Sequence, residues 1–221
     1  MGIARVIDAT AERLDDVTEE VARTVFSGGT VIFPTDTSYA IGCDPYRSDA
    51  IDRVYSAVGR PDVRPLTLHV ATAQEFLEYA ADNQLAMLVA KRLLPGPLIM
   101  LVRKPAFVGD ELAAGLQTLA FRVPDDRLTQ ALLARCGPLS GTTANPRQGS
   151  RYGGGDEHSM LPSADLLVKH GPTRYESEST IIDLTGSHPR LLREGVIPER
   201  RLTELLGPVE RPAVKVRTPP S

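Results

Sequence analysis

Hydroxyl and carboxyl side chains follow a short apolar run near the start of the sequence, where residues 30–33 lead through Pro34 into the Thr-Asp-Thr-Ser of residues 35–38. Hydrogen-bonding groups at the end of a strand are typical of ligand sites in α/β proteins. A polar turn has the same composition, and one isolated segment of this kind favours the turn. Further segments of the same type shift the interpretation toward a ligand site.

Arginine and small polar side chains recur at the ends of later apolar runs. Guanidinium groups donate forked hydrogen bonds to phosphate and carboxylate oxygens, and hydroxyl and amide groups add single bonds. Such a set predicts recognition of an anionic ligand by positioning, without the nucleophile and base that covalent catalysis requires. The residues concerned are Arg60, Arg64, Arg122, Thr143, Asn145, Ser179 and Arg193.

Some of these features also have a simpler interpretation. Arg60 and Arg64 lie four residues apart in a proline-containing segment, where exposed arginines are more often solvated than bound to a polyanion. His69 follows a predicted strand, where it is either a buried sheet histidine or a ligand contact. The sequence offers no Walker loop, Rossmann glycine pattern, zinc-protease helix or nucleophile elbow.

The composition is that of a globular chain with one sizeable core. Of 221 residues, 42% are hydrophobic and 24% charged, and 25 basic residues stand against 28 acidic ones. This balance excludes extended disorder and gives no electrostatic signature of bulk nucleic-acid binding. The apolar runs are far shorter than the ~20 residues of a membrane span, and Arg5, Asp8 and Glu12 interrupt any secretory signal. Two cysteines are too few for a disulfide scaffold. We therefore expect a cytoplasmic protein.

Predicted helices and strands alternate along the chain. Caps and apolar periodicity predict helices over residues 10–27, 48–58 and 125–136, and helices that begin at Thr72 and Asn83. Short β-like runs occupy residues 30–33, 66–70, 98–102, 118–123, 180–184 and 189–192. Several connections are too short for helical crossovers, so the order predicts an α/β fold with a mixed sheet.

The type and order of five of these segments resemble the YrdC-like family of threonylcarbamoyl-adenylate synthases, from about Thr10 to Leu206. The resemblance implies a twisted mixed sheet flanked by helices around a large basic concave cavity. It also implies a nucleotidyltransferase that condenses L-threonine, bicarbonate and ATP with Mg²⁺ into threonylcarbamoyl-AMP and pyrophosphate, for the threonylcarbamoyladenosine modification of tRNA. We expect a single YrdC-like domain over residues 1–206, a disordered proline-rich tail over residues 207–221, and no metal site held by the protein itself.

Matched position by position, the resemblance assigns each candidate residue to a substrate. Contacts with L-threonine are expected from Thr37, His69, Arg122, Thr143 and Ser179. Contacts with ATP are expected from Arg60, Arg64, Thr118, Asn145 and Arg193, with Arg60 and Arg64 as the catalytic residues. The residue types fit these roles, because a guanidinium can take the carboxylate of an amino acid bidentately and arginines neutralise charge at a reacting phosphate.

Two departures mark a divergent member of the family. The family's Lys-x-Arg motif reads Val58-Gly59-Arg60 here, so a valine replaces the lysine. Loss of a charge-assisted contact typically costs ~1.5–3 kcal/mol. The family's Ser-Ala-Asn-x-Ser-Gly loop reads Thr-Ala-Asn-Pro-Arg-Gln-Gly over residues 143–149, with one serine fewer and one residue more.

Two alternative functions follow from these departures. The first is a paralogue that hydrolyses or transfers a carbamoyl-adenylate in the same cavity. The second is a non-catalytic module that binds double-stranded RNA or tRNA. Only 5% of the residues are aromatic and none is tryptophan, which leaves few side chains for base stacking and disfavours the second alternative.

Overall fold

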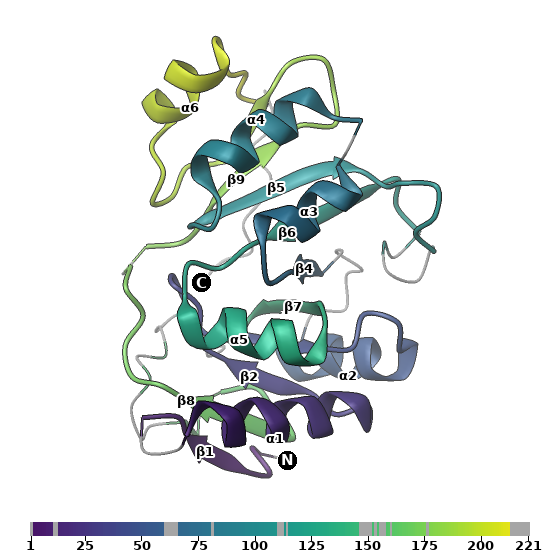
Figure 1. Cartoon of the computed structure of the whole chain (residues 1–221), viewed down its shortest axis with the longest axis vertical. Helices are drawn as coiled ribbons and strands as arrows, with labels where there is room; N and C mark the ends of the chain where they lie inside the picture. Colours follow the sequence, from purple (N-terminus) through teal and green to yellow (C-terminus); the bar gives the residue numbers. More distant parts are fainter. Residues whose placement is uncertain are drawn as a thin grey trace.

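The computed structural model confirms an α/β fold, and the residues that it describes form one ten-stranded sheet and six helices (Figure 1). The described residues are 2–10, 13–59, 66–80, 82–109, 113, 115–145, 152, 154, 158–159, 161–175 and 177–212. The strands are β1 (Val6–Asp8), β2 (Val31–Phe33), β3 (Ala40–Cys43), β4 (Thr67–His69), β5 (Leu98–Arg103), β6 (Thr118–Arg122), β7 (Leu139–Thr143), β8 (Leu166–Lys169), β9 (Thr180–Asp183) and β10 (Arg190–Arg193). The helices are α1 (Leu14–Phe26), α2 (Ser48–Val58), α3 (Ala73–Tyr79), α4 (Gln84–Leu93), α5 (Arg127–Cys136) and α6 (Glu199–Leu206).

The sheet combines parallel and antiparallel pairs, as the short connections predict. Its strand order is β1-β8-β2-β3-β7-β4-β6-β5-β9-β10. β3 pairs antiparallel with β2 and β7, whereas β5 pairs antiparallel with β6 and parallel with β9. The antiparallel pair of β7 and β4 joins a lower half, from β1 to β7 in this order, to an upper half, from β4 to β10 (Figure 1).

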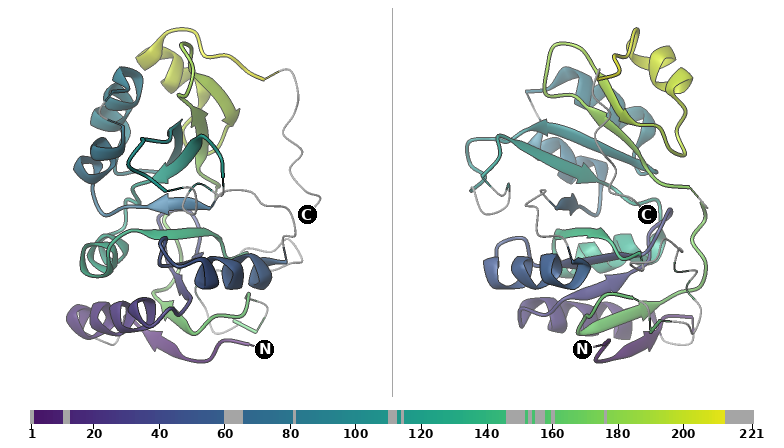
Figure 2. Two further views of the ribbon diagram at one scale, coloured as in Figure 1. Left: turned by 90° about the vertical axis from the view of Figure 1, so that its right-hand side faces the viewer. Right: turned by 180° about the vertical axis from the view of Figure 1, so that it is seen from behind.

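Four helices cover one face of the sheet, and α2 lies on the opposite face (Figure 2, left). α1 and α5 pack side by side over the lower half, and α3 and α4 pack over the upper half. Successive side chains of β2 point to opposite faces of the sheet. Val31 and Phe33 pack in the core cluster under α1 and α5, and Ile32 packs in the cluster under α2. The strand that leads into the polar turn is therefore held from both sides.

Side-chain caps begin three helices where the sequence predicts them. Thr72 and Asn83 each accept a hydrogen bond from a backbone N–H in the first helical turn, at 3.1 and 2.9 Å. Asp126 caps α5 by accepting from the N–H of Thr129 at 2.8 Å. The Thr129 hydroxyl also donates to the carbonyl of Pro34 at 2.6 Å, so the start of α5 is tied to the polar turn after β2.

The apolar pattern predicts neither β3 nor β7, although both carry segments singled out for their polar residues. Each strand contains a glycine, a residue that weakens strand patterns. Gly42 and Gly141 lie opposite each other in the pair. A Cβ at Gly141 would lie 2.7 Å from the carbonyl oxygen of Ile41, so the close approach of the two strands requires glycine there.

The start of the expected C-terminal tail belongs to the fold. Within residues 207–212, Glu210 forms backbone hydrogen bonds of 2.8 and 2.9 Å beside β10. Arg211 forms an ion pair of 2.8 Å with Glu194. The expected disorder therefore does not extend to residues 207–212, and residues 213–221 lie outside the described part of the chain.

Candidate functional site

Six of the ten residues predicted to bind substrate line one pocket. The lining residues are Thr37, Arg122, Thr143, Asn145, Ser179 and Arg193, together with Ser38, Ile99 and Glu178. They come from the turn between β2 and β3, the ends of β6 and β7, the approach to β9 and the end of β10. The space among these side chains is about 20 Å³, close to the volume that holds one water molecule. This pocket is far smaller than the large basic cavity that the resemblance implies, and residues 60–65 and 146–151, which carry predicted ATP contacts, lie outside the described residues.

The other predicted ATP-binding residues do not line this pocket as described. Arg60 and Arg64 lie outside the described residues, as do residues 146–151 of the predicted nucleotide loop. Thr118 begins β6, four positions before Arg122. At about 3.3 Å per residue, Thr118 lies roughly 13 Å from Arg122 along the strand.

A hydrogen bond between the two halves of the sheet shows how the pocket forms. The hydroxyl oxygens of Thr37, before β3, and Ser179, before β9, lie 3.2 Å apart. β3 and β9 are five strand spacings apart in the sheet, which is about 24 Å in a flat sheet with strands about 4.8 Å apart. The sheet is therefore strongly twisted, as expected, and the twist brings the polar turn against the start of β9.

Arg122 forms the buried end of the pocket. Its side chain is 5% exposed, and that of its ion-pair partner Asp36 is fully buried. Arg122 Nη2 donates to Asp36 Oδ1 and to Thr37 Oγ1, both at 2.6 Å. Both two-pronged edges of a guanidinium include Nη2, and this nitrogen has only two hydrogens. In this arrangement Asp36 and Thr37 take both hydrogens, so a bidentate grip of Arg122 on a substrate carboxylate requires one of these two hydrogen bonds to break.

Burial dominates the electrostatics of this ion pair. Loss of hydration raises the pKa of Asp36 and lowers the pKa of Arg122, and their mutual attraction offsets each shift only in part. Asp36 Oδ2 and Arg122 Nε have no hydrogen-bond partner among the described residues. A buried polar atom without a partner costs about 1–3 kcal/mol, so a ligand that supplies the missing bond is favoured here.

Arg193 forms the open end of the pocket. Its Nε and Nη2 donate to the carbonyl oxygen of Ser179 at 3.0 and 2.9 Å. Its Nη1 lies 2.9 Å from Glu178 Oε2, and the side chains of Arg193 and Glu178 are 29% and 44% exposed. Water screens such a pair, so an anionic ligand can compete with Glu178 for Arg193 more easily than with Asp36 for Arg122.

His69 lies beside Arg122 in the register of β4 and β6 but does not line the pocket. Its Nδ1 lies 3.0 Å from the carbonyl oxygen of Thr67, and its ring packs edge-on against Phe33 with centroids 5.5 Å apart. Burial, with the nearby charge of Arg122, lowers the pKa of His69 to about 3, so the ring is neutral at physiological pH. These contacts favour the sheet-histidine interpretation over a contact with the amino acid substrate.

Val58, at the position of the family's lysine, is the last residue of α2. Gly59 follows with a φ of 64°, a left-handed conformation that ends the helix. The Val58 side chain is half-buried and packs on the apolar cluster under α2. The valine therefore contributes to the core and does not line the described pocket.

The sequence-based set of site residues omits the two carboxylates that pair with the arginines of the pocket. Asp36 directly precedes Thr37, and Glu178 directly precedes Ser179. The hint in the sequence is that each carboxylate is a neighbour of a predicted site residue. The pairing itself joins Asp36 to Arg122 across 86 positions and has no local signal.

The described residues hold no group of three or more His, Cys, Asp or Glu side chains that is placed to bind a metal ion. The two carboxylates at the pocket, Asp36 and Glu178, are each paired with an arginine. The described helices also lack the length and apolar character needed to cross a membrane.

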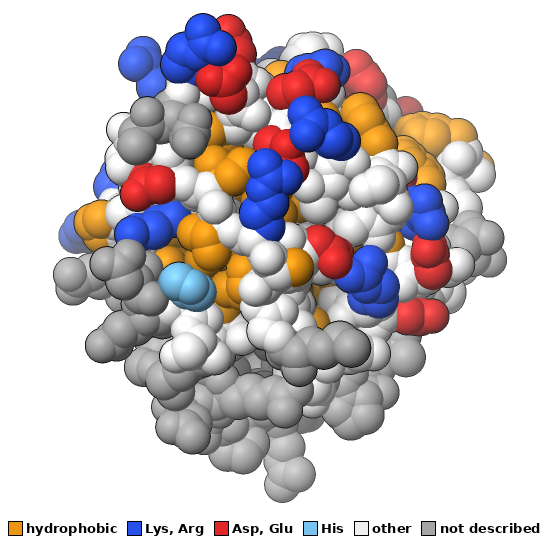
Figure 3. Space-filling view, turned by 90° about the horizontal axis from the view of Figure 1, so that it is seen from below, with side chains coloured by type: hydrophobic (Ala, Val, Ile, Leu, Met, Phe, Trp, Pro, Cys, Tyr) orange, Lys and Arg blue, Asp and Glu red, His pale blue; other side chains and the backbone are white. Residues whose placement is uncertain are grey.

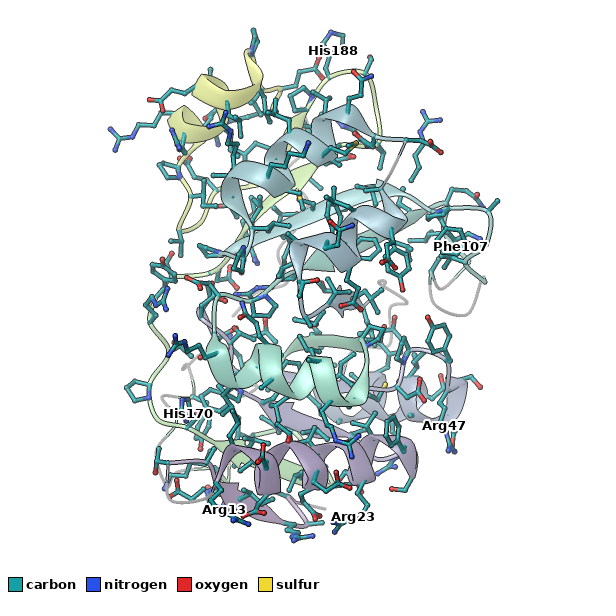
Figure 4. The ribbon with its side chains drawn as sticks, viewed as in Figure 1. Arg13, Arg23, Arg47, Phe107, His170 and His188 are labelled. Carbon is teal, nitrogen blue, oxygen red and sulfur yellow. The ribbon has the colours of Figure 1, made fainter. Side chains whose placement is uncertain are left out.

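Charge of both signs is interspersed on the face at the bottom of Figure 1, which Figure 3 shows directly. Arg13, just before α1, and Arg23, on α1, form ion pairs with Asp16 and Glu20 at 2.8 and 2.6 Å, and Figure 4 labels both arginines at this end. The described part of this face is therefore not a continuous basic surface of the kind that binds nucleic acid.

Comparisons with known proteins agree with this architecture. Residues 23–195 match the profile of the Sua5, YciO and YrdC family, which is described as telomere recombination. A threonylcarbamoyl-AMP synthase of Pyrococcus abyssi is 32% identical over 195 residues, which cover 85% of this chain and 56% of that protein. The crystal structure of P. abyssi Sua5 complexed with L-threonine has a TM-score of 0.78 and 27% identity, over 96% of this chain and 62% of that one.

A further solved structure, Escherichia coli YciO, has a TM-score of 0.72 and 26% identity, over 89% of this chain and 97% of that one. The chain spans about half the length of the first curated relatives that it matches, at 56% and 53%. The family profile covers most of the sequence, in the segments that build the sheet and the pocket. The chain therefore belongs to the Sua5, YciO and YrdC family.

Proposed function

We propose that the chain is a threonylcarbamoyl-AMP synthase, a nucleotidyltransferase that converts L-threonine, bicarbonate and ATP to threonylcarbamoyl-AMP and pyrophosphate. The observation that carries the proposal is the pocket in which residues assigned to both substrates meet, with an arginine at each end. The activity for which the P. abyssi relative is named, and the complex of P. abyssi Sua5 with L-threonine, support the choice of reaction and amino acid.

The buried end of the pocket suits an amino acid with a side-chain hydroxyl. Thr37, Thr143 and Ser179 offer hydroxyl groups beside Arg122. A site built to bond a hydroxyl rejects analogues that lack it, because its own polar groups are then left unpaired. L-threonine, followed by L-serine, should therefore raise the melting temperature more than L-valine. Equal stabilisation by threonine and valine would contradict this assignment.

The open end suits the phosphates of ATP. Arg193 and Asn145 line it, and we propose that Arg60 and Arg64 complete it. The proposed contact of Thr118 with ATP lies farther away, because Thr118 begins β6 four positions before Arg122. A carbamate, formed from threonine and bicarbonate with loss of water, attacks the α-phosphorus while pyrophosphate leaves. This step needs positioning and charge neutralisation, which arginines and Mg²⁺ supply without a protein nucleophile. We propose that Mg²⁺ arrives with ATP, because both pocket carboxylates are already paired.

Mass detection of the product tests the proposal. The purified chain, given ATP, Mg²⁺, ¹³C-bicarbonate and L-threonine, should form labelled threonylcarbamoyl-AMP, and omission of threonine should abolish it. Arg193→Ala should reduce product formation. Arg190→Ala is the matched control, because Arg190 lies on the same strand but pairs with Asp183 outside the pocket. Absence of product under all conditions would contradict the proposal.

The alternatives give different results in the same assays. A paralogue that hydrolyses or transfers a carbamoyl-adenylate turns over without dependence on threonine. An RNA-binding module binds tRNA in a salt-sensitive manner and shows no turnover. Under the synthase proposal, tRNA and the tRNA-modification proteins use the product, and the cytoplasm is the proposed location.

A further inference from the structure

The buried carboxylate behind the pocket has a role that the predicted site does not include. Asp36 does not line the pocket, whereas its partner Arg122 does. We propose that Asp36 is a positioning residue that fixes which nitrogens of Arg122 face the amino acid substrate. The identity of that amino acid rests on the proposed function, but the positioning of Arg122 does not.

The geometry at Nη2 determines what Arg122 can offer to a ligand. Asp36 Oδ1 and Thr37 Oγ1 accept both hydrogens of Nη2, at 2.6 Å each. Rotation about the bond between Cζ and Nη2 would break both hydrogen bonds together. Nε and Nη1 are the remaining nitrogens, and Nε has no partner among the described residues. A carboxylate ligand is therefore expected to accept single hydrogen bonds from Arg122 rather than a forked pair.

The turn that carries Asp36 is fixed, so the carboxylate cannot follow a moving guanidinium. Thr35 Oγ1 accepts hydrogen bonds from the backbone N–H groups of Thr37 and Ser38, both at 3.2 Å. The carbonyl oxygen of Asp36 accepts from the N–H of Tyr175 at 2.8 Å, in the segment that links β8 to β9. The backbone is therefore fixed on both sides of Asp36, as it must be if Asp36 is to position the side chain of Arg122.

An ion pair with a buried carboxylate can also serve stability alone, and the described part of the chain contains a second such pair, whose arginine is 46% exposed. Asp183 is 6% exposed and pairs with Arg190, but neither residue lines the pocket. A structural role for Asp36 predicts that Asp36→Ala and Asp183→Ala both lower stability and leave ligand affinity unchanged. A positioning role predicts that only Asp36→Ala changes the affinity for the amino acid, and does so through Arg122.

The experiment combines ¹⁵N NMR of the Arg122 guanidinium with calorimetric titrations of L-threonine and of ATP. In the native chain, the two Nη2 hydrogens should give separate signals because rotation is hindered, and in Asp36→Ala they should average. Asp36→Ala should weaken threonine binding at least tenfold and change ATP binding less than twofold. Asp36→Asn keeps an oxygen acceptor for Nη2 and should retain both hindered rotation and threonine affinity within threefold. Asp36→Ser is the second variant should the alanine variant not fold.

Coupling to Arg122 decides between the two roles. In an Arg122→Ala background, Asp36→Ala should cause no further loss of threonine affinity, because Asp36 acts through Arg122. Additive losses, or equal losses for threonine and ATP, would overturn the proposal, as would averaged Nη2 signals in the native chain. If the native chain binds no threonine while Asp36→Ala still frees the rotation of Arg122, the proposed function fails and the positioning role stands.

Discussion

The two ends of the pocket use the same chemical groups in different surroundings. Arg122 and Asp36 are 5% and 0% exposed and lie 2.6 Å apart, whereas Arg193 and Glu178 are 29% and 44% exposed and lie 2.9 Å apart. Exposed ion pairs contribute about 0–1 kcal/mol, but removal of one partner from a buried pair costs about 3–5 kcal/mol. Burial therefore makes one end a fixed part of the structure and leaves the other able to exchange its carboxylate for the anion of a ligand.

The largest expected effect contrasts the two carboxylates directly. Asp36→Asn should lower the free energy of unfolding by about 3–5 kcal/mol, because it leaves the charge of Arg122 buried and unpaired. Glu178→Gln should lower it by less than about 1 kcal/mol. Urea unfolding of both variants measures the difference. Similar losses in the two variants would mean that burial does not distinguish the two ends.

The next effect is the pH dependence that His69, buried beside Arg122, gives to the stability of the fold. Because the pKa of His69 is about 3 in the folded chain and about 6.5 in the unfolded chain, the unfolded chain binds the extra proton between these values. The contribution of neutral His69 is fully present above about pH 6.5 and is lost as the pH falls toward 3. Stability should fall by about 2–3 kcal/mol between pH 6.5 and 4.5 from this residue alone.

Unfolding curves of His69→Gln at several pH values test this dependence, because glutamine removes the titrating ring and should flatten the slope. His188→Gln is the control, since His188 is exposed on the turn between β9 and β10 (Figure 4). An equal slope in the native chain and in His69→Gln would assign the pH dependence to other groups.

A smaller effect is expected from ligand exchange at the open end. Arg193→Ala should weaken ATP binding by about 1.5–3 kcal/mol, the range for hydrogen bonds that involve a charged group. Glu178→Gln should strengthen ATP binding, because the triphosphate then has no carboxylate to displace from Arg193. Calorimetry with ATP and Mg²⁺ measures both changes, with Arg190→Ala as the matched control. Weaker ATP binding in Glu178→Gln would show that Glu178 orients Arg193 instead of competing with the ligand.

The smallest expected effect concerns the family's lysine position. Val58→Lys should raise kcat severalfold with little change in KM, because an ammonium group stabilises negative charge that develops in the transition state. The fold should tolerate the change, since lysine is favourable at a helix C-terminus and its stem can cover the cluster that Val58 covers. Ser56→Lys, at an exposed position of the same helical turn, should leave kcat unchanged. Unchanged kcat in Val58→Lys would separate this position from catalysis.

The sequence predicts the features that depend on local chemistry or on the family pattern. Thr72 and Asn83 begin their helices as expected, and Asp126 caps the helix predicted to start at Asp125 or Asp126, because a cap needs only the next three residues. The pocket residues were predictable through the resemblance, which carries long-range information that no local pattern contains. β3 and β7 were not predictable from apolar periodicity, because Gly42 and Gly141 interrupt it where the two backbones approach each other closely.

The charge pairing of the site was not predictable for a different reason. Arg122 and Arg193 were predicted to donate to ligands, but the sequence does not show which of its own carboxylates form ion pairs with them. Asp36 meets Arg122 only because the twist of the sheet brings β6 to the polar turn after β2. The geometry at Nη2 then decides between a forked and a single hydrogen bond, and that geometry depends on the folded arrangement of Asp36, Thr37 and Arg122.

The hydrogen bond between Thr37 and Ser179 spans 142 residues and has a consequence for protein synthesis. The ribosome makes the polar turn early in synthesis. Arg122 follows Thr37 by 85 residues, and Ser179 and Arg193 are made later still. A nascent chain that still lacks β9 and β10 contains Arg122 and Asp36 but neither the hydroxyl of Ser179 nor the guanidinium of Arg193. The pocket is complete only after the last strands have joined the sheet, so an unfinished chain lacks the residues that close it.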